Sequence, residues 1–240
     1  MRITRILACW AEVPVLLRGE RQHLANWVKT MELERVLVLV GAMVLGSGLY
    51  GAAMGSWRGE GQMFCTGLKF PMILLLTSLG TALLNGMLAP LLGLNLGLRQ
   101  SVLAVLMSFA IAALVLGGFS PLLLFLTWNV PPLTTGAAVP EFTYALLRLT
   151  HVLAIGFAGA AANLRLLQVL EQLAGDRRVA RRVLGAWLLS NLLLGSQLVW
   201  ILRPLIGSPH LPVQFLRANA FEGNFYETVF HAVVRILANP

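Results

Sequence analysis

The sequence predicts an all-α membrane protein, a polytopic bundle of about five transmembrane helices with amphipathic interfacial segments at both ends. The chain of 240 residues is 58% hydrophobic and only 12% charged, whereas soluble domains are typically about 25% charged. Five long apolar stretches are separated by short polar breaks, and each helical crossing of a bilayer needs about 20 apolar residues. Strict alternation of apolar and polar residues is absent from the sequence, which argues against an outer-membrane barrel.

The five predicted spans follow one another closely, at 36–55, 70–93, 101–127, 142–164 and 183–206. In lipid, every backbone N–H must find an acceptor within its own segment, so we expect all five spans to be helices. They divide the chain into an N-terminal segment (1–35), a transmembrane domain (36–206) and a tail (207–240). In the third span, the Gly-Gly-Phe-Ser-Pro run at 117–121 is expected to kink or break the helix.

The N-terminal segment mixes apolar and charged residues over 3–31. This pattern predicts one or two interfacial helices along the inner leaflet, with Trp10 and Trp27 at the depth of the lipid headgroups. A cytoplasmic docking surface for a partner protein is the alternative.

The positive charges are unevenly distributed in a chain of net charge +8. Six of them precede the first span and four more lie at 177–182, whereas the loop 128–140 has none. The positive-inside rule therefore predicts a cytoplasmic N-terminus and an extracytoplasmic C-terminus. Cys9 and Cys65 would then lie on opposite sides of the membrane. The dispersed arginines favour the lipid bilayer as a partner and argue against nucleic acid.

Tyr144, Arg148 and His151 fall on one face of the predicted fourth span, which makes them a candidate intramembrane polar site. At 1.5 Å per residue, His151 lies about 14 Å inside the span, near the middle of the bilayer. Ionisable groups at this depth are costly and often functional. Three roles are open: Arg148 extends outward and pairs with Glu141, the face binds a ligand, lipid or proton, or it contacts another subunit.

Small residues recur every four positions in two spans, where they allow close helix packing. The first set belongs to the first span and the second to the fourth, and either can form a contact within the chain or between chains. The candidate packing residues are Ser47, Gly51, Gly55, Gly156 and Ala160.

The tail begins with prolines that stop the fifth span, the first of them Pro204. Helical periodicity returns at 224–238, where Glu227, His231 and Arg235 are spaced to pair along one face. We expect a bent, extended segment that leads into an amphipathic surface helix. The candidate docking residues of the tail are Arg203, Asn224, Tyr226 and Glu227.

Two sequence runs carry a resemblance to a known family. The run LKFPMILLLT at 68–77 is similar to the start of a bacterial Yip-type second span. The runs LRPLIGSP at 202–209 and GNFYE at 223–227 are similar to tails of bacterial proteins of this kind. With its five closely spaced spans, the chain resembles the Yip family from about residue 33 to its end. The resemblance implies a protein of the bacterial inner membrane without known enzymatic activity, although eukaryotic members act in vesicle traffic.

Three functions are consistent with these features. The first is a non-enzymatic scaffold or accessory subunit, whose partners are other membrane protein subunits. The second is a small transporter or lipid-handling protein that uses the polar face of the fourth span. The third is a membrane-embedded enzyme, which requires its acid–base groups to converge. Its candidate groups are His210, Glu222, Glu227 and His231. The sequence has no metal-ligand motif, and we expect no cofactor.

Overall fold

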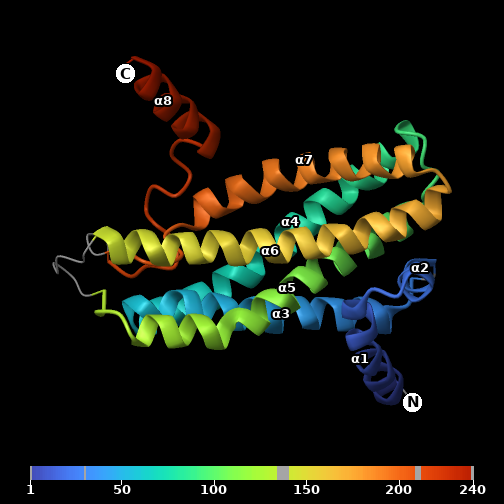
Figure 1. The fold of residues 1–240 in the computed structure, drawn as a ribbon, viewed down its shortest axis with the longest axis horizontal. Coiled ribbons are helices and arrows are strands. Elements are labelled where there is room, and N and C mark those ends of the chain that lie inside the picture. Colours follow the sequence, from blue (N-terminus) through green and yellow to red (C-terminus); the bar gives the residue numbers. More distant parts are fainter. Residues whose placement is uncertain (1, 30, 134–140, 209–211, 239–240) are drawn as a thin grey trace.

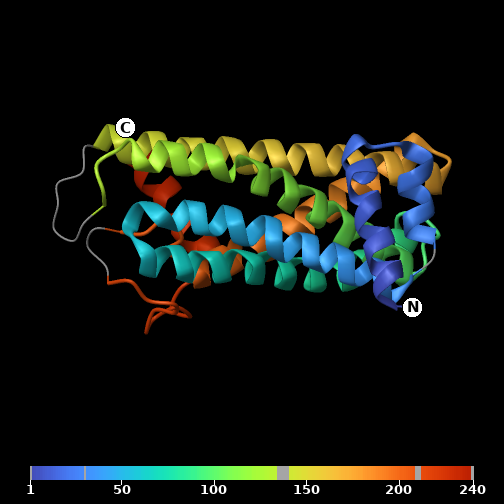
Figure 2. The same cartoon turned by 90° about the horizontal axis from the view of Figure 1, so that it is seen from below.

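Five long helices form the body of the protein and lie lengthwise beside one another (Figures 1 and 2). The computed structural model describes residues 2–29, 31–133, 141–208 and 212–238, and every regular element within these ranges is helical. The five helices are α3 (Leu33–Gly55), α4 (Glu60–Leu91), α5 (Leu98–Trp128), α6 (Glu141–Ala174) and α7 (Arg177–Leu202). All five are long and apolar enough to cross a bilayer. The predicted all-α bundle with five candidate spans is confirmed.

The two ends of the bundle carry different segments (Figures 1 and 2). Helices α1 (Arg2–Arg18) and α2 (Arg21–Lys29) lie at one end, beside the α4–α5 and α6–α7 connections. The single-turn helix η1 (Ser56–Arg58) and the tail that leads to α8 (Phe225–Ala238) lie at the other end, which we call the tail end. An odd number of crossings therefore places α1 and α8 at opposite ends.

Helix α3 is at the centre of the packing, with α4 and α5 against it. Glycines permit this close approach: a Cβ atom built on Gly51 would lie 2.5 Å from the Thr66 carbonyl oxygen of α4. Half of the most apolar stretch of α3 and of α5 is buried within the chain, compared with 6% for α7. The core therefore belongs to α3, α4 and α5, while α7 remains largely uncovered.

Helix α2 covers one end of the bundle rather than standing apart from it. Leu24 and Val28 are fully buried, and both belong to the main core cluster together with residues of α3 and α5. The Trp27 indole N–H donates to Glu12 Oε2 of α1 at 2.5 Å, and Arg35 donates to the Trp27 carbonyl oxygen at 3.1 Å. These contacts join both N-terminal helices to the start of α3.

Helix boundaries follow local capping chemistry. Gly175 takes a positive φ of 66° after α6, and Asp176 accepts a hydrogen bond from the Arg178 amide at 2.7 Å to cap α7. The run at 117–121 was expected to kink or break the helix, and it does not break it, because α5 continues through Pro121 without interruption. Neighbouring helices support a proline inside a membrane helix, and here Gly117 packs directly against Gly46 of α3.

Candidate functional site

The polar face predicted on α6 is divided between the interior and the surface of the bundle. His151 is buried, and its Nδ1 lies 3.0 Å from the Tyr50 hydroxyl of α3. Their rings meet edge to face with centroids 5.8 Å apart. One group donates and the other accepts, according to the imidazole tautomer. His151 therefore forms a satisfied interhelical hydrogen bond on the inner side of α6.

Tyr144 and Arg148 stay together, but away from His151. The Arg148 guanidinium lies 5.7 Å from the centre of the Tyr144 ring, and the Arg148 side chain is exposed. The Tyr144 hydroxyl donates to the Gly207 carbonyl oxygen of the tail at 3.3 Å. The side chain of Glu141, the partner expected for Arg148, lies outside the described residues. Arg148 thus faces outward near the tail rather than into the bundle with His151.

The two sets of small residues have opposite environments. Ser47, Gly51 and Gly55 are buried on α3, and a Cβ atom on Gly55 would lie 2.5 Å from the Gln62 carbonyl oxygen of α4. Gly156 and Ala160 are exposed on α6, and nothing in the described structure lies within 4 Å of a Cβ atom built on Gly156. The α3 set forms a contact within the chain, while the α6 set is uncovered.

A line of buried polar side chains runs along α4, and sequence analysis missed most of it. Its members are Gln62, Thr66, Lys69, Thr77, Ser78, Thr81 and Asn85, each no more than 3% exposed. Apart from the adjacent pair Thr77 and Ser78, successive members are three, four or eight residues apart, which places them on one side of the helix. The prediction started this span at residue 70, although α4 begins at Glu60. The helical spacing of Gln62, Thr66 and Lys69 was the signal available in the sequence.

The tail-end part of this line holds the tail by its backbone. Gln62 Nε2 donates to the Pro204 and Leu205 carbonyl oxygens at 3.0 and 3.1 Å, and the Thr66 hydroxyl donates to Leu205 at 2.7 Å. Lys69 Nζ donates to the Gln214 carbonyl oxygen at 3.0 Å. The side chains of α4 therefore satisfy carbonyl groups of an irregular segment that lies against the bundle.

Of the predicted docking residues, Tyr226 joins α8 to α7. Asn224 caps α8, because its Oδ1 accepts from the Glu227 amide at 2.8 Å. The Tyr226 hydroxyl lies 2.5 Å from Ser196 Oγ and donates to the Leu193 carbonyl oxygen at 2.6 Å. Arg203, at the end of α7, stacks on the Trp200 ring. Asn224, Tyr226 and Glu227 are exposed, whereas Arg203 is half-buried.

The acid–base groups proposed for an enzyme do not form a cleft in the described structure. Glu222, Glu227 and His231 are all exposed, and the His231 ring lies 3.9 Å from the Glu227 carboxylate. His210 and the side chain of Arg235 lie outside the described residues. The described part of the chain also lacks a group of three or more His, Cys, Asp or Glu residues able to hold a metal ion.

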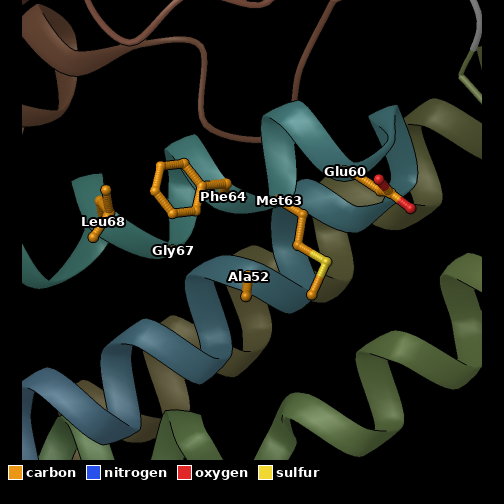
Figure 3. A pocket seen from close by; sticks show the side chains of 6 residues that line it. All are labelled: Ala52, Glu60, Met63, Phe64, Gly67 and Leu68. Atoms are coloured by element: carbon orange, nitrogen blue, oxygen red, sulfur yellow. The ribbon is translucent and has the colours of Figure 1, made fainter.

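Two surface hollows differ in their polarity. One, of about 260 Å³, lies where α3 and the start of α4 meet, and its lining is almost wholly apolar (Figure 3). The residues around it are Ala52, Glu60, Met63, Phe64, Gly67 and Leu68. The other, of about 410 Å³, lies between α1 and the start of α3 and is lined by Cys9, Glu12 and Arg35 among others. The apolar hollow suits a hydrocarbon chain, and the polar one suits water or a small polar group.

Comparison with known proteins yields no relative for this chain. No protein-family model, curated protein or solved structure matches it.

Proposed function

We propose that this chain is a non-enzymatic scaffold or accessory subunit of a larger membrane complex, and that a neighbouring transmembrane helix packs on the open small-residue face of α6. We define this face by Gly156, Gly159 and Ala160. The observation that carries the proposal is the empty space above its glycines, where nothing in the described structure lies within 4 Å of an added Cβ atom. The Yip-type resemblance is in keeping with such a non-catalytic role.

The glycines on this face lower the stability of α6 unless another helix packs against them. Glycine inside a helix is less favourable than alanine by about 1 kcal/mol. On α3, Gly51 and Gly55 offset this cost by close contacts with α4. Gly156 and Gly159 have no such contact in the described structure. In lipid, helices associate through close packing over small residues, because the surrounding hydrocarbon is as apolar as their side chains.

Large apolar side chains flank the open face and complete a surface suited to a helix. Val152 and Leu153 are each 64% exposed, and Phe157 is 60% exposed. A groove of glycine and alanine between such side chains can receive the ridge of a second helix. Lipid can cover an apolar surface of any shape, so it does not require small residues between large ones. The pattern of small and large residues therefore favours a protein partner over lipid alone.

Extraction from native membranes in a mild detergent, followed by mass measurement of the intact particle, tests this proposal. We expect the wild-type chain in a particle heavier than one copy. Gly156→Leu fills the groove and should release the single chain. Gly185→Leu is the matched control: Gly185 on α7 is equally open, but the residues three and four positions away are arginines and leucines, so it belongs to no small-residue face. This variant should leave the particle intact. A wild-type chain recovered alone, or a particle that survives Gly156→Leu, contradicts the proposal.

A second candidate is a small transporter or lipid-handling protein, with its polar face on α4 rather than α6. It is favoured by Asn85, which is fully buried and whose amide has no partner in the described structure. An amide in this state favours a ligand or water that supplies the missing hydrogen bonds. Substrate flux or lipid transfer is measured in proteoliposomes. Activity in the wild-type chain that is lost in Asn85→Leu supports this candidate. Equal rates in Asn85→Leu and wild type dismiss it.

A further inference from the structure

Three cations gather at the tail end of the bundle, around the junction of α7 and the tail. Lys69 comes from α4, Arg203 follows α7 directly, and Arg217 belongs to the tail. Arg217 Nε donates to the Arg203 carbonyl oxygen at 3.1 Å. The Arg203 guanidinium lies 3.0 Å from the centre of the Trp200 ring. We call Lys69, Arg203, Arg217 and Trp200 the tail cation cluster.

The cluster contains positive charge without a carboxylate to balance it. In the described structure, no ion pair joins Lys69, Arg203 or Arg217 to an acidic side chain. The charge of Arg217 acts on both Lys69 and Arg203, so the three cations lie within electrostatic reach of one another. Burial, and then the charge of Arg217, lower the pKa of Arg203. Like charges held close together repel one another, and a bound anion relieves that repulsion.

Two buried donors of the cluster also lack acceptors in the described structure. Arg217 Nη2 and Trp200 Nε1 are buried and have no hydrogen-bond partner in the described structure. Lys69, by contrast, is fully buried and donates to the Gln214 carbonyl oxygen. The Nη2 group of Arg217 and the Nε1–H group of Trp200 are therefore both free to donate to a ligand. Buried donors of this kind are rare in proteins unless water or a ligand occupies their position.

We propose that the tail cation cluster binds a phosphate-type oxyanion. Arginine guanidinium groups present several N–H donors in a plane that matches two phosphate oxygens at once. Arg203 and Arg217 supply these donors, Trp200 supplies an indole N–H, and Lys69 of α4 adds a third positive charge. A phosphate group carries both the negative charge and the several acceptor oxygens that this cluster lacks.

The position of the cluster matches the depth of lipid headgroups. It lies directly beyond Leu202, where the candidate span formed by α7 ends. Lys69 Nζ lies 5.7 Å from the centre of the Phe215 ring, so aromatic rings adjoin the cluster on two sides. Aromatic residues gather at the membrane–water interface, where the phosphates of phospholipids lie. The phosphate of an anionic lipid and free inorganic phosphate share the chemistry that the cluster recognises.

Binding to the purified full-length chain in detergent tests this proposal without any variant. The probes are phosphatidylglycerol, phosphatidylcholine and inorganic phosphate, with bound lipid counted by native mass spectrometry and phosphate binding measured by calorimetry. We expect phosphatidylglycerol to bind at least about tenfold more tightly than phosphatidylcholine if the source is a lipid headgroup. Saturable phosphate binding without lipid preference identifies free phosphate as the source. Neither lipid preference nor phosphate binding overturns the proposal.

Substitutions then locate the site. Arg217→Gln and Arg203→Gln should each weaken binding of the preferred probe about tenfold, because each removes one charge and its donors. Arg217→Lys keeps the charge but loses the planar group, and an intermediate loss is expected. Arg99→Gln is the matched control, because it also removes one arginine charge, from an exposed position in the first turn of α5. The affinity of this variant for the same probe should stay within twofold of wild type. Equal affinity of Arg217→Gln, Arg203→Gln and Arg99→Gln places the anion elsewhere and contradicts the proposal.

Discussion

The hydroxyl of Tyr50 on α3 lies 3.0 Å from Nδ1 of His151 on α6, and both side chains are buried. This hydrogen bond links the central helix of the bundle to a helix at its edge. Because α6 also presents the open small-residue face, the Tyr50–His151 pair helps to hold that face in its orientation.

Replacement of Tyr50 by phenylalanine should destabilise the bundle by about 1–3 kcal/mol, because it leaves the buried imidazole without its partner. Thermal unfolding in detergent measures this change as a lower midpoint. In the Tyr50→Phe background, His151→Leu should cost less than it does in the wild-type chain, because the hydrogen bond is already lost. Independent, additive effects of the two substitutions would show that the pair does not interact.

Gly51→Leu should destabilise the monomer severely, in contrast to Gly156→Leu. A Cβ atom on Gly51 already lies 2.5 Å from the Thr66 carbonyl oxygen, so a larger side chain forces α3 and α4 apart. Overpacking of this kind typically costs about 1–3 kcal/mol, and more where the backbone itself must move. Gly156→Leu meets open space and should not destabilise the monomer; it should raise its stability by up to about 1 kcal/mol, because leucine is the better helix former. Unfolding midpoints of the two variants in detergent distinguish these outcomes, and equal losses argue against the described packing.

Lys69→Met should loosen the tail while the bundle remains folded. Lys69 Nζ donates to the Gln214 carbonyl oxygen at 3.0 Å, and a hydrogen bond from a charged donor is worth about 1.5–3 kcal/mol. Hydrogen exchange of the buried Ala220 amide, which donates to the Arg217 carbonyl oxygen in the tail, should accelerate about tenfold, because about 1.4 kcal/mol corresponds to a factor of ten. Amides of α3 and α5 serve as the internal reference. Unchanged exchange in the tail means that Lys69 does not hold it.

The thiol of Cys9 should react only at a higher pH than an ordinary cysteine. Burial and the nearby Glu12 carboxylate raise its pKa, so the reactive thiolate forms later as the pH increases. The pH dependence of alkylation in a Cys65→Ser chain measures this shift. Glu12→Gln removes the second cause and should move the alkylation profile to lower pH. A profile at the position of a free thiol, unaffected by Glu12→Gln, contradicts the prediction.

The spans themselves were predictable because apolar length alone identifies them. The prediction starts α4 ten residues late, because Gln62, Thr66 and Lys69 are polar and resemble a loop, although their helical spacing is a signal for the longer helix. Their side chains are buried because tail residues more than 130 positions later, including Leu205 and Gln214, supply acceptors for them. Contacts between such distant segments leave no local signal that these residues are buried.

The predicted site on α6 shows how far helical periodicity can guide a functional prediction. Arg148 and His151 are three residues apart, which separates them by about 60° around the helix axis. That angle is small enough to suggest one polar face but large enough to place His151 inside and Arg148 outside. Which small-residue set is covered also depends on the arrangement of the helices. Both Gly51 and Gly156 fit the same pattern, and only the fold shows that Gly156 is open.

Photo-crosslinking in native membranes tests the central claim, that a neighbouring helix covers the open face of α6. A photoreactive benzoylphenylalanine replaces Phe157, an exposed aromatic residue beside the open face, and a second chain carries it at Leu79, an exposed residue of α4. If a helix covers the face, position 157 gives a discrete adduct with a protein and position 79 gives lipid adducts alone. Lipid adducts alone at both positions would contradict the claim.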